Sequence, residues 1–282
     1  MQSMLVVVAG LAVRIDLDGE GDCAAFASRL APFSFAANAD PDCAAAPPGD
    51  LLALRLHSFS APAPDCDKLR VSRDGEGHAC AGDGIKGRIG ARAGELSVHG
   101  GEAGLVAALR LACALWLAPR GGLLLHGACA RIDGGAHAFL GASGAGKTTL
   151  SGRLAGRGVG IVSDEVTAIR FGRAFGQPFQ SKLGDGVLPR EGLPLRAISI
   201  LAHAQTGCGP SHRPLRGALA ARAIFARIFL PARDPQTLRE SMHGAAELAR
   251  AAPLAELFLP DDDRAADAAL RVSATPEAQV RQ

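Results

Sequence analysis

The residues with the clearest chemical potential form one short glycine-rich segment. It matches the pattern G-x-x-x-x-G-K-[ST] at every position, as Gly141, Ala142, Ser143, Gly144, Ala145, Gly146, Lys147 and Thr148. Small residues let the backbone wrap a phosphate closely, so that N–H groups and the positive end of a following helix face the anion. We expect Lys147 to reach the β- and γ-phosphates and the Thr148 hydroxyl to ligate Mg²⁺, with Thr149 completing the nucleotide-binding segment. A glycine-rich turn without a ligand is the alternative.

Two adjacent carboxylates, Asp164 and Glu165, follow 16 residues after Thr148. The apolar residues around them predict a strand over Gly160–Arg170. Asp164 or Glu165 can hold Mg²⁺, and a nearby acid can deprotonate an attacking hydroxyl. Because adjacent strand residues face opposite sides, we expect the two to differ in role. The alternative is a capped or solvated strand end, whereas an ABC-type ATPase is excluded, because no LSGGQ-like signature precedes the acids.

The order of these pieces resembles the catalytic core of the HPr kinase/phosphorylase family over Leu123–Arg170. That family has a His-Gly strand, a short hairpin, a glycine-rich loop, a helix ending near Arg-Gly and a strand with an acidic pair. The matching segments are Leu124-Leu125-His126-Gly127, Asp133-Gly134, Gly141–Thr148, Leu154-Ala155-Gly156-Arg157-Gly158 and Ile161–Glu165. Weaker similarity continues at Gly176–Phe179 and Leu193–Ile198.

The resemblance implies a P-loop α/β domain related to phosphoenolpyruvate carboxykinase, which uses ATP and Mg²⁺ to phosphorylate a serine hydroxyl. By position it implies that His126 is an active-site histidine and that Asp164 is the general base. It also implies that Lys147 contacts phosphate and that Thr148, Asp164 and Glu165 are metal ligands. Glu165 stands where the family has a second Asp, which moves that carboxylate by one methylene.

Two family features are missing, namely the E-I-R-G-[LM]-G signature and the usual N-terminal domain. We therefore do not expect phosphorylase activity, the family's hexamer or HPr as the substrate. The chain is more similar to shorter HPr-kinase-like proteins, some of which are tailoring kinases in peptide-modification pathways.

A phosphoryl-transfer site also needs a further cation near the γ-phosphate. Basic residues in or beside the glycine-rich loop Gly172–Pro194 are candidates, and each can equally be a solvated charge: Arg173, Lys182, Arg190 and Arg196. Lys182 stands out, because the chain has only four lysines. A polar helix face, or docking of an acidic partner, explains the later series of Arg213, Arg216, Arg222 and Arg227.

The sequence patterns of the helices and strands that must position these residues predict an α/β fold with two regions. Residues 1–100 form a smaller β-rich region, with strands near Leu11–Leu17, Leu52–Leu56 and Gly94–Val98. Residues 101–282 form the P-loop domain. There a helix over Leu105–Leu117 precedes the strand-loop-helix-strand series around the glycine-rich segment.

The rest of the second region is predicted to alternate between strands and helices. We expect a strand over Leu195–Leu201, a helix near Leu215–Leu230 and a helix that starts at Asp234-Pro235. A strand over Leu254–Leu259 and a helix over Asp262–Arg271 complete the prediction.

Composition limits the class of protein. The chain has 282 residues, 48% hydrophobic and 21% charged, with 35 glycines and a formal net charge of +2. These proportions indicate a folded globular protein and argue against a dedicated nucleic-acid binder. The apolar run Gly104–Pro119 contains Arg110 and is too short for a membrane span, so we expect no membrane partner and a cytoplasmic location. Seven cysteines without a CxxC pair indicate reduced thiols.

The sequence thus favours a kinase that uses ATP and Mg²⁺ to phosphorylate a serine of a protein or peptide. Two alternatives stay open: a nucleotide-binding regulatory or scaffold protein with little transfer activity, and a small-molecule kinase with the same site. The sequence is also compatible with an oligomer.

Overall fold

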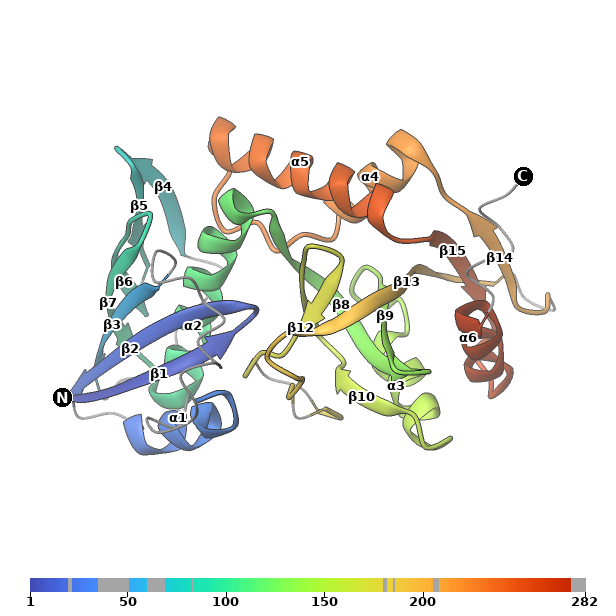
Figure 1. The fold of residues 1–282 in the computed structure, drawn as a ribbon, viewed down its shortest axis with the longest axis horizontal. Coiled ribbons are helices and arrows are strands. Elements are labelled where there is room, and N and C mark those ends of the chain that lie inside the picture. Colours follow the sequence, from blue (N-terminus) through green and yellow to red (C-terminus); the bar gives the residue numbers. More distant parts are fainter. Residues whose placement is uncertain are drawn as a thin grey trace. The chain divides into compact units, whose positions relative to one another are not determined.

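The protein has a mixed α/β fold with two β-sheets in a computed structural model (Figure 1). The structure describes residues 1–19, 22–34, 51–59, 69–82, 84–179, 182–184, 186–204 and 208–274. The chain divides into two compact units. Unit 1 comprises Met1–Arg120, Gly176–Phe179 and Leu230–Arg239, and unit 2 comprises Gly121–Phe175, Gln180–Phe229 and Glu240–Gln282.

Unit 1 is built on seven strands in the order β1-β2-β3-β7-β6-β5-β4. These are β1 (Gln2–Val8), β2 (Leu11–Gly19), β3 (Leu52–Phe59), β4 (Arg70–Asp74), β5 (Gly77–Ala81), β6 (Ile85–Ile89) and β7 (Ala93–His99). β3 pairs in parallel with β2 and β7, and the other neighbours are antiparallel. Along β3 burial alternates, so that Leu54 and Leu56 are buried and Arg55 is exposed. β2, β3 and β7 confirm the three predicted strands, whereas β1, β4, β5 and β6 are additional strands that the sequence pattern did not predict.

The helices of unit 1 cover part of this sheet. They are α1 (Cys23–Leu30), a 3₁₀ turn (Ala31–Phe33), α2 (Gly101–Leu117) and a second 3₁₀ turn (Ala118–Arg120). α2 contacts β3, β6, β7 and α1, and the Trp116 indole donates a hydrogen bond to the Gly90 carbonyl at 2.8 Å. α2 therefore groups with unit 1 and not with the predicted domain of residues 101–282, because its apolar residues are buried against the first sheet.

The expectation that the apolar run Gly104–Pro119 is too short for a membrane span is wrong, because the helical stretch Gly101–Arg120 is long and apolar enough to cross a membrane. It is the one such helix among the described residues. Most of it is buried inside the protein. A core helix passes the same test, so this finding is weak support for a membrane span.

Unit 2 contains a sheet of eight strands. These are β8 (Gly122–Ile132), β9 (Gly135–Leu140), β10 (Gly160–Ser163), β11 (Val166–Arg170), β12 (Arg173–Phe175), β13 (Leu193–His203), β14 (Ser211–Pro214) and β15 (Leu254–Leu259). β8 pairs with β11 through its first half and with β9 through its second half. β13 pairs in parallel with β9 and β15, and β12 joins β11 to β13. The pairing β8-β11-β12-β13-β9 closes on itself, so residues distant in sequence meet around β8.

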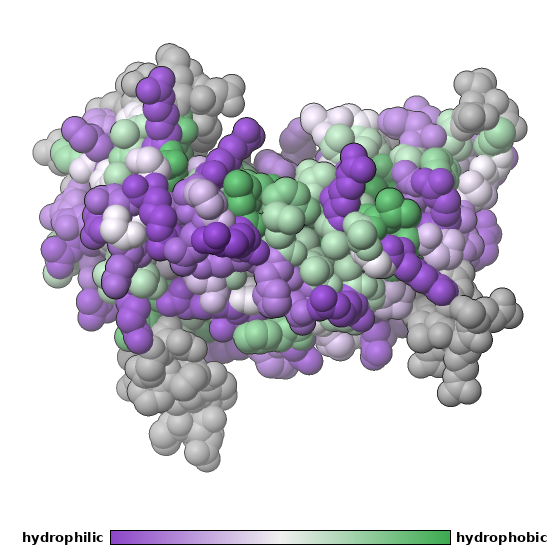
Figure 2. Space-filling view, turned by 90° about the horizontal axis from the view of Figure 1, so that it is seen from above, coloured by the Kyte–Doolittle hydropathy of each residue, from purple (hydrophilic) through white to green (hydrophobic). Residues whose placement is uncertain are grey.

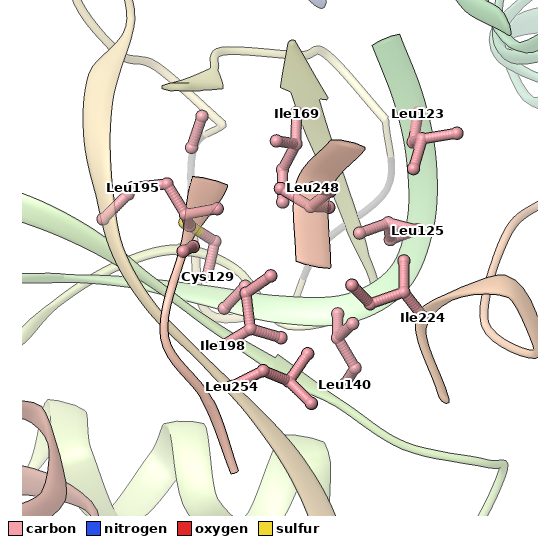
Figure 3. Packing of buried hydrophobic residues seen from close by; sticks show 14 of the residues in the cluster. Leu123, Leu125, Cys129, Leu140, Ile169, Leu195, Ile198, Ile224, Leu248 and Leu254 are labelled. Atoms are coloured by element: carbon pink, nitrogen blue, oxygen red, sulfur yellow. The ribbon is translucent and has the colours of Figure 1, made fainter. Parts of the chain in front are cut away.

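Four helices pack with this sheet: α3 (Lys147–Ala155), α4 (Gly217–Phe225), α5 (Pro235–Ala251) and α6 (Arg264–Ala274). Figure 3 shows the core of unit 2, where Leu125, Ile224 and Leu248 from β8, α4 and α5 point toward one another. Ile198 and Leu254 extend this core along the parallel strands. In a second cluster, Leu150 and Leu154 of α3 pack with alanines of α6.

The start of α5 confirms the predicted cap at Asp234. The Asp234 carboxylate accepts hydrogen bonds from the backbone N–H groups of Gln236 and Thr237, both at 3.1 Å. The second oxygen accepts the Thr237 hydroxyl at 2.6 Å and lies 3.2 Å from His78 Nε2. Burial opposes ionisation, but the hydrogen bonds from Thr237, His78 and Gln236 lower the pKa of Asp234 to about 2. The cluster fixes the first turn of α5 on β5 within unit 1.

The cysteines agree with the expected free thiols where the structure describes them. Cys80, Cys113 and Cys129 are free and buried, and burial raises their pKa values to about 11, 12 and 12. Cys43 and Cys66 lie outside the described residues. Burial makes the three thiols poor nucleophiles, which supports a packing role.

Hydrophilic and hydrophobic residues are mixed on the face that Figure 2 shows, with purple charged side chains projecting around smaller green areas. Leu219 of α4 and Met242 of α5 are examples of exposed apolar side chains. Exposed residues of this kind are common on protein surfaces and carry no functional argument by themselves.

Candidate functional site

The glycine-rich loop connects β9 to α3. β9 ends at Leu140, and α3 begins at Lys147, directly after Gly146. Gly144 and Gly146 have φ angles of +79° and +83°, in the left-handed region that glycine adopts at low cost. A Cβ atom on Gly141 would lie 2.7 Å from the Ala145 Cβ. The loop therefore requires small residues both for its backbone conformation and for its packing.

The Lys147 side chain bonds back to the start of this loop. Its Nζ donates hydrogen bonds to the carbonyls of Gly141 at 2.9 Å and Ala142 at 2.8 Å. Burial lowers the pKa of Lys147, Glu165 opposes that shift, and the nearby Arg227 guanidinium lowers the pKa further. This ammonium is thus hydrogen-bonded to neutral carbonyls, although two charged side chains lie close enough to influence its pKa.

The loop opens into a cavity of about 630 Å³ in unit 2. Its lining combines the loop, the acidic pair and one lysine: Ser143, Gly144, Gly146, Lys147, Thr148, Thr149, Asp164, Glu165 and Lys182. Most predicted nucleotide and metal residues are therefore brought together in one place. Gly141, Ala142 and Ala145 form the base of the loop and are not among the lining residues.

The predicted continuous strand Gly160–Arg170 is wrong, because it is broken at the acidic pair. β10 ends at Ser163 and β11 starts at Val166. The Ser163 hydroxyl accepts the backbone N–H groups of Glu165 and Val166, both at 3.3 Å, which favours a turn over an extended chain. The bend brings both Asp164 and Glu165 to the cavity rather than to opposite faces of a sheet.

The two acids nevertheless have different surroundings. Asp164 is 4% exposed, and its Oδ1 accepts the backbone N–H of Lys182 at 2.9 Å. Glu165 is exposed, and its carbonyl accepts the Gly127 N–H at 2.9 Å. Asp164 is held in one orientation, whereas the Glu165 side chain projects from a fixed backbone.

The segment after Lys182 stays close to β10. A Cβ atom on Gly184 would clash with the Val162 carbonyl, and the Gly186 N–H donates to the same carbonyl at 2.9 Å. This close passage explains how the backbone N–H of Lys182 reaches Asp164.

His126 lies near the middle of β8 and is exposed. It is opposite Val166 of β11 in the strand register, one residue from Glu165. Its ring meets that of Phe229 edge-on, with centroids 5.8 Å apart. His126 does not line the cavity described above, so the structure places it beside the acidic pair without bringing its ring into the same lining.

The other predicted cations differ in whether they lie at the cavity. Arg173 donates to the carbonyls of Glu191 at 2.6 Å and Gly192 at 2.9 Å, which supports the loop before β13. The Arg196 side chain covers Gly135, at the end of β9 opposite the glycine-rich loop. Lys182 lines the cavity, whereas Arg173, Arg190 and Arg196 do not.

Sequence reasoning missed His203 as a contact of the loop. Its Nε2 lies 3.1 Å from the Gly144 carbonyl, at the C-terminal end of β13. β13 is the parallel neighbour of β9, so both strands end on the same side of the sheet. No local signal identifies His203, because the contact depends on this pairing.

The oxygen ligands at this cavity suit a Mg²⁺ ion that is also bound by the phosphates of a nucleotide. Among the described residues, no three His, Cys, Asp or Glu side chains come together as a metal site. Asp164, Glu165 and the Thr148 hydroxyl offer oxygen ligands at one cavity. Mg²⁺ usually keeps waters and binds phosphate oxygens together with one or two carboxylates, so these three oxygen donors suit an ion that arrives with a nucleotide.

No protein-family model matches the chain, and no curated protein matches it. Among solved structures, the chain is similar to the HPr(Ser) kinase/phosphatase from Coxiella burnetii. The identity is 13% and the TM-score is 0.29, over 54% of this chain and 95% of the other. Similarity at this level supports no functional conclusion, which must come from the site itself.

Proposed function

We propose that the protein is a kinase that uses ATP and Mg²⁺ to transfer the γ-phosphoryl group to a hydroxyl. The observation that carries this proposal is that the glycine-rich loop, Asp164, Glu165 and Lys182 line the same cavity. Its volume of about 630 Å³ lies within the range of roughly 300–1,000 Å³ that is usual for small-molecule sites. Loop, acids and cations are the parts that phosphoryl transfer requires.

In this proposal the loop binds the triphosphate. The first N–H groups of α3 and the N–H groups of the loop face the anion, and the helix dipole adds partial positive charge. Lys147 exchanges its bonds to the Gly141 and Ala142 carbonyls for phosphate oxygens. Because those carbonyls are neutral, a phosphate is the stronger partner for the ammonium.

Thr148, Glu165 and Asp164 would hold the magnesium ion. When bound, Mg²⁺ would neutralise charge on the phosphate oxygens. The hydroxyl of Thr148 lies at the first turn of α3, next to Lys147, which suits a ligand that shares the ion with the nucleotide.

Asp164 is the proposed general base. Its carboxylate takes the proton from the acceptor hydroxyl as that oxygen forms a bond to the γ-phosphorus and the bond to the bridging oxygen of ADP breaks. The N–H of Lys182 fixes Asp164 Oδ1, so the orientation of the carboxylate is set before the acceptor arrives. Lys147 and Lys182 oppose the negative charge on the transferred group.

The proposed acceptor is a serine of a protein or peptide, as the family resemblance implies. A small-molecule hydroxyl would use the same cavity and the same base. The exposed position of His126 beside the acidic pair suits contact with an acceptor that approaches from solvent.

A second function, a nucleotide-binding regulatory protein, is favoured by one observation. Glu165 is exposed and carries one methylene more than the Asp of the family pattern, so its hold on the metal is looser than a short buried carboxylate would provide. Such a protein would bind ATP in the same cavity and transfer little phosphate.

Asp164→Asn separates these functions. We expect phosphoryl transfer to candidate acceptors to fall by about 10²- to 10⁴-fold, because general-base catalysis has that magnitude. ATP affinity, measured by calorimetry with Mg²⁺, should change only a few-fold. Asp261→Asn, the same change at an exposed ion pair with Arg153, is the control and should keep full transfer. A wild-type protein that binds ATP but transfers phosphate to no acceptor would contradict the kinase and leave the regulatory protein.

A further inference from the structure

His203 is the last residue of β13, and the sheet of unit 2 fixes its backbone. It pairs with Leu259 of β15, and the following N–H, that of Ala204, donates to the Leu259 carbonyl at 3.0 Å. On its other side β13 pairs in parallel with β9, whose last residue, Leu140, directly precedes the glycine-rich loop. Because parallel neighbours end at the same edge of a sheet, His203 and the loop follow adjacent strand ends.

The side chain of His203 contacts the middle of the loop. Its Nε2 lies 3.1 Å from the Gly144 carbonyl oxygen. A carbonyl oxygen only accepts hydrogen bonds, so Nε2 carries the proton and donates it. The same peptide group is held at its other end, since the Ala145 N–H donates to the Ala142 carbonyl at 3.1 Å. The peptide between Gly144 and Ala145 is therefore fixed at both ends, with its oxygen turned toward His203.

The orientation of this peptide matters for an anion bound in the loop. Gly144 lines the cavity, and its φ of +79° lies where glycine moves at low cost, so its own backbone preference does not fix the carbonyl. A carbonyl oxygen that faced a phosphate would repel it, because both carry negative charge. His203 does not line the cavity, so its donor stabilises the orientation in which this oxygen is directed to a group outside the cavity lining.

The bond from His203 also differs from the bonds that Lys147 makes to the loop. The Lys147 ammonium bonds to the carbonyls of Gly141 and Ala142, and in the proposed function it exchanges both for phosphate oxygens. Those two bonds are then lost to the loop. The His203 bond joins a donor outside the cavity lining to an acceptor that a phosphate cannot use, so a ligand does not compete for it.

We propose that His203 is a positioning residue of the phosphate-binding loop, whose Nε2–H holds the Gly144 carbonyl away from the bound phosphates. This inference rests on the proposed function, since it takes the loop as a phosphate site. The bond is made before the ligand arrives, so the loop is ordered in advance and binding costs less. Because His203 acts on the loop, it strengthens the binding of a polyphosphate chain with or without a base and a ribose.

The test compares the affinities for ATP and for inorganic tripolyphosphate, each measured with Mg²⁺ by calorimetry on the full chain. His203→Ala should weaken both about fivefold, which is the size of one net hydrogen bond. His203→Gln should stay within about twofold of the wild type, because its amide N–H reaches the position of Nε2. His203→Asn carries the same amide on a side chain one methylene shorter and should behave like His203→Ala. His243→Ala, at an exposed histidine of α5, is the control and should keep both affinities.

Three results would overturn the role of His203 and leave the nucleotide site in place. They are unchanged affinities in His203→Ala, a His203→Gln protein that binds as weakly as His203→Ala, and a loss for ATP alone, which would indicate a contact with the base or ribose. A wild type that binds neither ATP nor tripolyphosphate would instead overturn the nucleotide site, and the role of His203 with it. If His203→Ala does not fold, the comparison of His203→Gln with His203→Asn decides the question, since only the first keeps a donor at the required reach.

Discussion

The two units use polar side chains in opposite ways. In unit 1, Asp234, Thr237 and His78 bond to one another and to the start of α5, so each group is satisfied by a neighbour. In unit 2, Lys147 lines the cavity and bonds to backbone carbonyls, although charged groups of both signs lie close by. A closed polar cluster stabilises a fold, whereas cations held by neutral carbonyls beside a cavity are available to a ligand.

The largest expected effect is on ligand binding in unit 2. Lys147→Ala should reduce ATP affinity or phosphoryl transfer by at least about 100-fold, because it removes a charged group aimed at the phosphates. The thermal midpoint should change little, since the two lost hydrogen bonds go to carbonyls of an open loop. Calorimetry and thermal unfolding measure the two effects.

Lys86→Ala is the matched control for that change. Lys86 is exposed on β6 of unit 1, so its loss should alter neither ATP affinity nor stability. If Lys147→Ala bound ATP as well as the wild type, the claim that Lys147 of unit 2 is available to a phosphate ligand would be contradicted.

A smaller effect, on stability alone, is expected in unit 1. Asp234→Ala removes the cap of α5 and leaves His78 and Thr237 without their shared partner, so the free energy of unfolding should fall by about 2 kcal/mol. ATP affinity should stay unchanged. Denaturant unfolding measures the loss, and Asp74→Ala, at an exposed ion pair with Arg88, should cost less than about 1 kcal/mol.

The stabilisation from Asp234 has a defined pH range. Its pKa in the folded protein, about 2, lies below the ordinary value of 3.8, so the contribution is complete at neutral pH. It should decline as the pH falls from about 4 toward 2, and Asp234→Ala should lack this part of the acid transition. An Asp234→Ala protein with normal stability and altered ATP binding would contradict the purely stabilising role of the Asp234 cluster.

The sequence predicted correctly those elements that depend on interactions between residues close together in the chain. The cap at Asp234, the strand Leu254–Leu259 and the loop between β9 and α3 are where the sequence indicates them, because a side-chain cap, alternating burial and glycine positions act within a few residues. The break at the acidic pair also has a local signal, since the Ser163 hydroxyl can accept the N–H groups that follow it.

The parts that depend on distant pairing could not be predicted in this way. Arg227 is predicted to lie on a helix, because nothing in its neighbourhood indicates that the chain leaves α4 to pair with β8. His203 meets Gly144 through the pairing of β13 with β9. The cluster of His78 with Asp234 joins residues 156 positions apart. Such contacts follow from sheet topology, which single-residue preferences do not contain.

The most direct test of the central claim is amide hydrogen exchange of the wild-type protein with and without ATP and Mg²⁺. Binding at the cavity should slow exchange at residues 143–150 and at residues 164–165, where the loop, the first turn of α3 and the acidic pair meet. Strands β2 and β3 of unit 1 should exchange at the same rate in both states. Exchange that is unchanged around the loop, or slowed only in unit 1, would contradict a nucleotide site in unit 2.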